Sequence, residues 1–166
     1  MALYAIGDLH LCLSAPKPMD IFGGAWVGYM DKLREGLQHI TDEDTTVLLG
    51  DLSWALSLQE AREDFAWINN IPGKKIILKG NHDYWWNTAS KFRKFCEENS
   101  FSNMHLLHNN HFEYNGWAIC GTRGWFPDES QQTAVNNADY DKIINREVGR
   151  LKISLDAART LRNEYE

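Results

Sequence analysis

Short apolar runs alternate with helical hydrophobic spacing along the first part of the chain. Three runs have the length and composition of buried strands: residues 3–6, 45–49 and 75–78. Three stretches carry hydrophobic residues every three or four positions and are predicted to be helices: 26–40, 57–70 and 88–99. Strands that alternate with helices in this way predict an α/β architecture with parallel strands.

The pattern changes after the third helix. Three more strands are predicted, at 104–107, 111–114 and 117–120, and the last two are joined by Asn115-Gly116, a strong hairpin signal. Residues 121–138 are predicted to be a loop, followed by an amphipathic helix from about Asp139 with one apolar face: Ile144, Val148, Leu151 and Leu155. The fold class is therefore α/β, with layered mixed sheets flanked by helices in a single domain over residues 1–166.

Composition narrows the class of protein. The chain has 166 residues, 43% of them hydrophobic, and a net charge of -6. This size fits one domain, and the acidic balance argues against nucleic acid as a partner. The three cysteines form no CxxC pair, and the chain has no apolar run of about 18 residues that could span a membrane. These features predict a cytoplasmic protein.

Polar residues of the kind that bind metals follow each of the first three strands: Asp8-Leu9-His10, Gly50-Asp51 and Gly80-Asn81-His82-Asp83. If the strands are parallel neighbours, these segments meet at one edge of the sheet. Asp51 can then share its two oxygens between two cations. Carboxylate, imidazole and amide ligands suit Mn, Fe, Zn or Ni better than Ca²⁺ or a thiolate-bound metal.

In this order and at these strand ends, the three segments resemble the calcineurin-like metallophosphoesterase superfamily. The resemblance implies a metal-dependent phosphoester hydrolase with mixed sheets packed between helices in α-β-β-α layers. It implies two divalent metal ions, the first bound by Asp8 and His10, the second by Asn81, and both bridged by Asp51. Hydroxide activated by the metals would attack a small phosphoester in line, with His82 as the general acid and Asp83 orienting it.

Two further segments are weaker candidates. Arg123 lies in a loop flanked by glycines, where its guanidinium could hold a phosphate; a surface ion pair explains this residue equally well. Residues 17–22 follow the first candidate ligands and suit a lid, although a solvated connector is equally compatible.

The family pattern continues with a strand that bears a single histidine and with a Gly-His-x-His element. No histidine follows His111 in this chain. The second metal would keep only Asp51 and Asn81, so we expect a C-terminally truncated chain that lacks the last strands and is weakly active or inactive alone.

Two alternative functions stay open. The chain could be a non-catalytic binding scaffold with this fold, which loss of ligands would indicate. It could also be a nuclease-type phosphodiesterase, which should carry a basic stripe, and none is visible in the sequence. The sequence leaves open whether the substrate is a monoester, a diester, a nucleotide or a phosphoprotein, because loops that line the pocket determine that choice.

Overall fold

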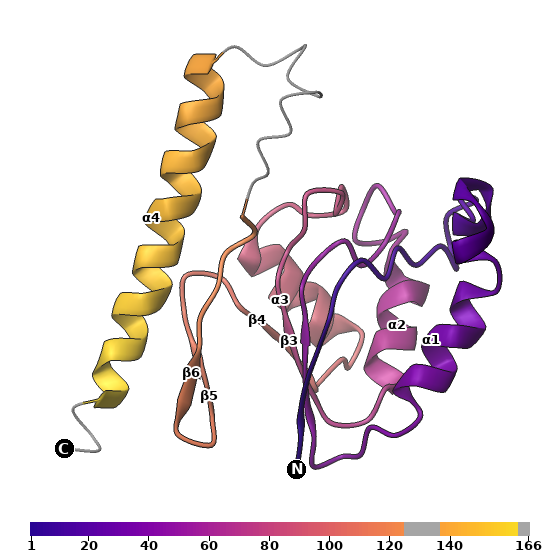
Figure 1. Ribbon diagram of the computed structural model, residues 1–166, viewed down its shortest axis with the longest axis horizontal. Helices are drawn as coiled ribbons and strands as arrows, with labels where there is room; N and C mark the ends of the chain where they lie inside the picture. The colour runs from indigo at the N-terminus through magenta and orange to yellow at the C-terminus, as the bar shows by residue number, and fades with distance from the viewer. Residues whose placement is uncertain (125–136, 163–166) are drawn as a thin grey trace. The chain divides into compact units, whose positions relative to one another are not determined.

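The computed structural model describes residues 1–124 and 137–162, with side chains from 140 to 159 in the second stretch (Figure 1). The chain divides into two compact units, Met1–Leu106 and Leu107–Glu166. Within the described residues, none of the helices combines the length and the apolar content that a membrane span requires. The α/β class predicted from the sequence is confirmed: a parallel sheet of four strands is flanked by helices.

The first unit is built on that parallel sheet. Its strands, in spatial order, are β1 (Leu3–Ile6), β2 (Thr45–Leu48), β3 (Lys74–Ile77) and β4 (Met104–Leu106). Their last residues are paired in one row across the sheet: Ile6, Leu48, Ile77 and Leu106. All four strands therefore end at the same edge, and the polar segments that follow them start side by side.

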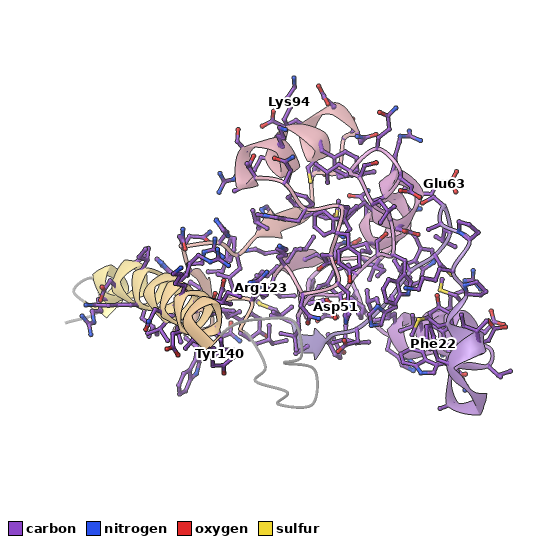
Figure 2. The ribbon with its side chains drawn as sticks, turned by 90° about the horizontal axis from the view of Figure 1, so that it is seen from above. Phe22, Asp51, Glu63, Lys94, Arg123 and Tyr140 are labelled. Atoms are coloured by element: carbon purple, nitrogen blue, oxygen red, sulfur yellow. The ribbon has the colours of Figure 1, made fainter. Side chains whose placement is uncertain are left out.

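Three α-helices connect these strands: α1 (Tyr29–Leu37), α2 (Arg62–Asn70) and α3 (Ala89–Glu98). The core contains edge-to-face aromatic contacts, with the ring of Phe65 on α2 centred 5.4 Å from that of Phe92 on α3. The opposite sides of these helices are exposed, as Glu63 and Lys94 show at the periphery of Figure 2. Helices α2 and α3 thus bury one face each, whereas α1 has only partly buried residues against the core, Met30 and Leu33. The sheet edge that carries the polar segments stays open.

Two of these helices begin later than the hydrophobic spacing predicts. Gly28 adopts a left-handed conformation with φ of 66°, which separates α1 from two short 3-10 helices, η1 (Met19–Phe22) and η2 (Gly24–Trp26). Before α2, the Ser57 hydroxyl accepts a hydrogen bond from the Glu60 N–H at 3.2 Å, as in a capping box, but the chain forms a turn there and becomes helical only at Arg62.

The second unit contains a β-hairpin and a long helix. Strands β5 (Phe112–Tyr114) and β6 (Trp117–Ile119) pair antiparallel across Asn115 and Gly116, whose φ angles of 49° and 78° are those of a tight hairpin turn. The hairpin was predicted correctly, but it forms a separate two-stranded sheet rather than extending the parallel one. Most of the predicted 121–138 loop lies outside the described residues.

The long helix α4 (Asn137–Arg162) buries a different face from the one predicted. Val148 and Leu155 of the apolar stripe are 60% and 47% exposed, whereas Glu147 and Ser154 are buried. The Ser154 hydroxyl accepts a hydrogen bond from the Gly121 N–H and donates one to the Asn110 carbonyl. Polar contacts with the loops beside the hairpin, rather than hydrophobic periodicity, determine which side of α4 is covered.

Candidate metal centre

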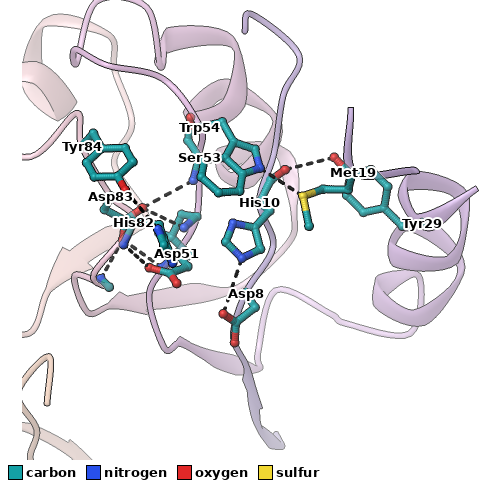
Figure 3. Close-up of polar contacts among 12 residues, drawn as sticks. Asp8, His10, Met19, Tyr29, Asp51, Ser53, Trp54, His82, Asp83 and Tyr84 are labelled. Carbon is teal, nitrogen blue, oxygen red and sulfur yellow. Dashed lines mark hydrogen bonds and ion pairs between the residues drawn. The ribbon is translucent and has the colours of Figure 1, made fainter. Parts of the chain in front are cut away.

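Three of the predicted ligands lie together at the carboxyl edge of the parallel sheet. One ligand atom from each of Asp8, His10 and Asp51 lies within 4.8 Å of the other two, and Figure 3 shows the three side chains around a common point. Asp8 and His10 follow β1, and Asp51 follows β2. The imidazole of His10 and the carboxylate of Asp51 are buried, whereas the side chain of Asp8 is 71% exposed. The cluster is therefore anchored on one side and open to solvent on the other.

The backbone at all three positions is left-handed. The φ angles of Asp8, His10 and Asp51 are 56°, 43° and 51°. Residues other than glycine rarely adopt this conformation, which costs energy and is concentrated at functional sites. Hydrogen bonds between the two loops hold it in place: the Asp8 N–H donates to the Gly50 carbonyl at 3.1 Å, and the His10 N–H donates to the Asp51 carbonyl at 2.8 Å.

Glycines allow the loops after β2 and β3 to touch. Gly50 has a φ of 102°, and a Cβ on it would overlap the backbone of Gly80. A Cβ on Gly80 would in turn overlap the carboxylate of Asp51. The two loops can therefore meet at the site only with glycine at both positions.

Asp83 connects the same two loops. Its buried carboxylate accepts hydrogen bonds of 2.7–2.9 Å from four donors: the N–H groups of Asp51, Leu52 and Gly80, and the indole of Trp85. Burial raises the pKa of the Asp83 carboxyl, and the N–H donors oppose that shift. Asp83 was predicted to orient His82, and that role stays a prediction. In the structure its carboxylate fixes the backbone beneath the candidate ligands, because the contact between the two loops turns these donors toward it.

His82 lies at the rim of the cluster. Its N–H donates to the Asp51 carboxylate at 2.8 Å, and its ring nitrogen Nδ1 lies 3.2 Å from the hydroxyl of Tyr84. The ring centroids of His82 and His10 are 6.0 Å apart. Burial lowers the pKa of His10, and the carboxylates of Asp51 and Asp8 act in the opposite direction. The net direction favours the neutral imidazole, which is the form that binds metals.

The two remaining candidates belong to different units. Asn81 is exposed and directly precedes His82, in the loop that approaches Asp51. Arg123 belongs to the second unit, where its guanidinium forms an ion pair with Glu147 at 3.3 Å and its side chain is only 13% exposed. An ion pair was the alternative predicted for Arg123, but this one is largely buried rather than at the surface.

Sequence reasoning missed the aromatic side of the site. The indole of Trp54 stacks on His10, and the hydroxyl of Tyr84 contacts His82. The ammonium of Lys17, from the segment considered as a lid, lies 3.3 Å from the ring centroid of Trp54. The sequence feature that could have identified Trp54 and Tyr84 is that each follows a candidate site residue within three positions. Aromatic residues of the buried core also occur at such positions, so this feature does not distinguish a residue of the site from a residue of the core.

The fold and this donor set define an α/β protein with a candidate divalent-cation centre at the carboxyl edge of a parallel sheet. The chain belongs to the calcineurin-like phosphoesterase family, whose model matches residues 1–152. No curated protein matches the chain. A solved structure of a protein of unknown function from Aquifex aeolicus is 20% identical in sequence, with a TM-score of 0.49, and the match covers 87% of this chain and 71% of that one.

Proposed function

We propose that this protein hydrolyses small phosphoesters with the help of divalent cations bound at its sheet edge. The observation that carries the proposal is the convergence of Asp8, His10 and Asp51, whose ligand atoms lie within 4.8 Å of one another. Membership of the calcineurin-like phosphoesterase family supports the same chemistry. The net charge of -6 favours a small substrate over a nucleic acid.

The residues fit a divalent cation. Ligands that bind one cation at about 2.0–2.2 Å each lie roughly 3–4 Å apart, a spacing that small side-chain movements can reach from the present one. Two carboxylates and one imidazole suit borderline metals such as Mn, Fe, Zn or Ni. We assign Asp8, His10 and Asp51 to a first cation, and Asp51 with Asn81 to a second. Divalent cations at such a site lower the pKa of water and neutralise charge on phosphoryl oxygens.

The chain supplies the remaining functions through the loop after β3. His82 is our candidate general acid, because its imidazole is partly exposed next to the ligand cluster. Its Nδ1 faces the hydroxyl of Tyr84, so Nε2 is the nitrogen that would donate a proton to the leaving oxygen. Asp83 supports this arrangement indirectly, since it holds the backbone of Asp51 and Gly80 in place.

The test is calorimetric titration of Mn²⁺ into the wild type and Asp51→Asn. Asparagine tolerates left-handed backbone and can still accept the His82 N–H, so the substitution mainly removes charge. We expect the affinity for Mn²⁺ to fall about tenfold or more. Glu63→Gln, which neutralises an exposed carboxylate on α2, is the matched control and should bind like the wild type.

Hydrolysis of nitrophenyl phosphate in excess Mn²⁺ should decrease in parallel in Asp51→Asn. Equal Mn²⁺ affinity in the wild type and this variant would refute the assignment of the site.

A further inference from the structure

We propose that Trp54 is a positioning residue, whose indole holds the imidazole of His10 in the orientation that metal binding requires. The inference rests on the proposed function, because it concerns the same metal site. It assigns a role to a residue that neither the sequence motifs nor the family match identifies.

The two rings are stacked. Their centroids are 4.7 Å apart and their planes differ by 17°, as close to parallel as any aromatic pair around the site (Figure 3). The ring of Trp26 approaches the same imidazole at 6.2 Å in an edge-to-face arrangement. Rotation of His10 about its Cβ–Cγ bond would break the stacking with Trp54, so the indole limits that rotation.

Hydrogen bonding does not account for the orientation of His10. A histidine that binds a metal usually donates its second ring N–H to a carboxylate or a carbonyl, which fixes the ring. Within the described part of the chain, the polar contact of the His10 ring is with Asp8, at 3.6 Å. Asp8 is itself a candidate ligand, so this contact cannot serve as an independent support. The stacked indole therefore takes over the role of orienting the ring.

Trp54 is itself held firmly enough to do this. Its indole N–H donates to the sulfur of Met19 at 3.1 Å, and its backbone N–H donates to the Leu11 carbonyl at 3.0 Å. The ammonium of Lys17 lies over the same indole, 3.3 Å from the ring centroid. The indole is thus contacted by Met19 at its N–H, by the stacked imidazole of His10 and by Lys17.

The three residues that contact Trp54 all come from the segment that follows β1: Lys17 and Met19 contact its ring, and Leu11 its backbone. Trp54 itself comes from the segment that follows β2. The stack therefore joins the two loops that carry Asp8, His10 and Asp51. Removing the indole should free the imidazole and weaken cation binding, without removing any ligand atom.

The first test needs no substitution. In the metal-free wild type, the indole should shift the NMR resonances of the His10 ring protons upfield through its ring current, with His10→Gln used to assign them. Shifts like those of an unstructured histidine would overturn the inference.

The second test compares Trp54→Leu, which removes the aromatic face, with Trp54→Phe, which retains one. We expect Trp54→Leu to abolish the upfield shift and to weaken Mn²⁺ binding about tenfold, an effect of the size seen when the groups that support a metal ligand are removed. Trp54→Phe should stay within about threefold of the wild type. Trp67→Leu is the control, since Trp67 is a partly buried tryptophan of α2, and its Mn²⁺ affinity should not change.

The outcomes separate the inference from the proposed function. Weak Mn²⁺ binding in Asp51→Asn together with wild-type affinity in Trp54→Leu would overturn the role of Trp54 and leave the metal site intact. An Mn²⁺ affinity equal to that of the wild type in Asp51→Asn would refute the proposed metal site, and with it the role of Trp54. Weakened binding in both variants, with Trp67→Leu unchanged, supports both.

Discussion

The residues of this site have two different roles. Asp8, His10 and Asp51 present ligand atoms to one point, whereas Asp83 presents none and holds the backbone beneath them. The buried carboxylate of Asp83 has four N–H donors at 2.7–2.9 Å and a fifth, the Ser53 N–H, at 3.4 Å, so both of its oxygens are saturated. We therefore expect Asp83 to contribute to the stability of the folded state more than to the reaction itself.

We predict that Asp83→Asn destabilises the fold by about 3 kcal/mol, since an amide offers one acceptor oxygen and turns its NH₂ group toward N–H donors. The measurement is urea-induced unfolding of the metal-free protein. Asp31→Asn, which removes only an exposed ion pair with Arg34, should change stability by less than about 0.5 kcal/mol. A similar small change in Asp83→Asn would contradict the role assigned to this carboxylate.

The candidate ligands could be named from the sequence because strand ends and side-chain chemistry are both local properties. Asp8, His10 and Asp51 each follow an apolar run, and parallel pairing is enough to bring them together. The partners of Asp83 could not be named, since they depend on how closely Gly50 and Gly80 approach. Such a distance is set by the packing of the whole sheet edge.

Among the secondary-structure elements, the sequence predicted correctly the features that depend on contacts between residues a few positions apart. Thr88 was predicted at the start of the third helix, and its hydroxyl accepts a hydrogen bond from the Lys91 N–H at 3.2 Å, capping α3. The starts of α1 and α2 and the covered face of α4 were not predicted correctly. They depend on the left-handed Gly28, on the turn around Ser57 and on polar contacts to Ser154, which hydrophobic spacing does not encode.

The cap on α3 gives a prediction at this scale. Thr88→Ala should lower the free energy of unfolding by about 1 kcal/mol, because the Lys91 N–H loses its acceptor. Thr88→Ser keeps a hydroxyl oxygen at the same place and should stay within a few tenths of the wild type. Thermal or urea-induced unfolding measures both, and equal losses for the two variants would show that the methyl group, not the cap, matters.

For the whole molecule, the family match extends from the first compact unit into the second. It spans residues 1–152, whereas the units are Met1–Leu106 and Leu107–Glu166. A single domain over residues 1–166 stays a prediction. Within the first unit, the stability of the folded state should respond to a single buried charge.

Lys75 on β3 is such a charge. Its side chain is fully buried, and its ammonium donates hydrogen bonds to the carbonyls of Ile71 and Gly73. Burial lowers the pKa of Lys75 from 10.5 to about 8, while the carboxylate of Asp42 acts in the opposite direction. Between pH 8 and 10.5, the unfolded chain therefore holds a proton on this lysine that the folded chain has released.

Stability rises with pH wherever the unfolded state binds more protons, so Lys75 should make the protein more stable as the pH increases through this window. The gain is at most about 3 kcal/mol, since each pKa unit corresponds to about 1.4 kcal/mol. Other groups titrate in the same range, so the test is the difference in unfolding free energy between the wild type and Lys75→Met, measured with urea from pH 7 to 10. We expect this difference to be flat below pH 8 and then to shift in favour of the wild type by about 2 kcal/mol. A difference that stays constant across the whole range would show that Lys75 keeps an ordinary pKa in the folded protein.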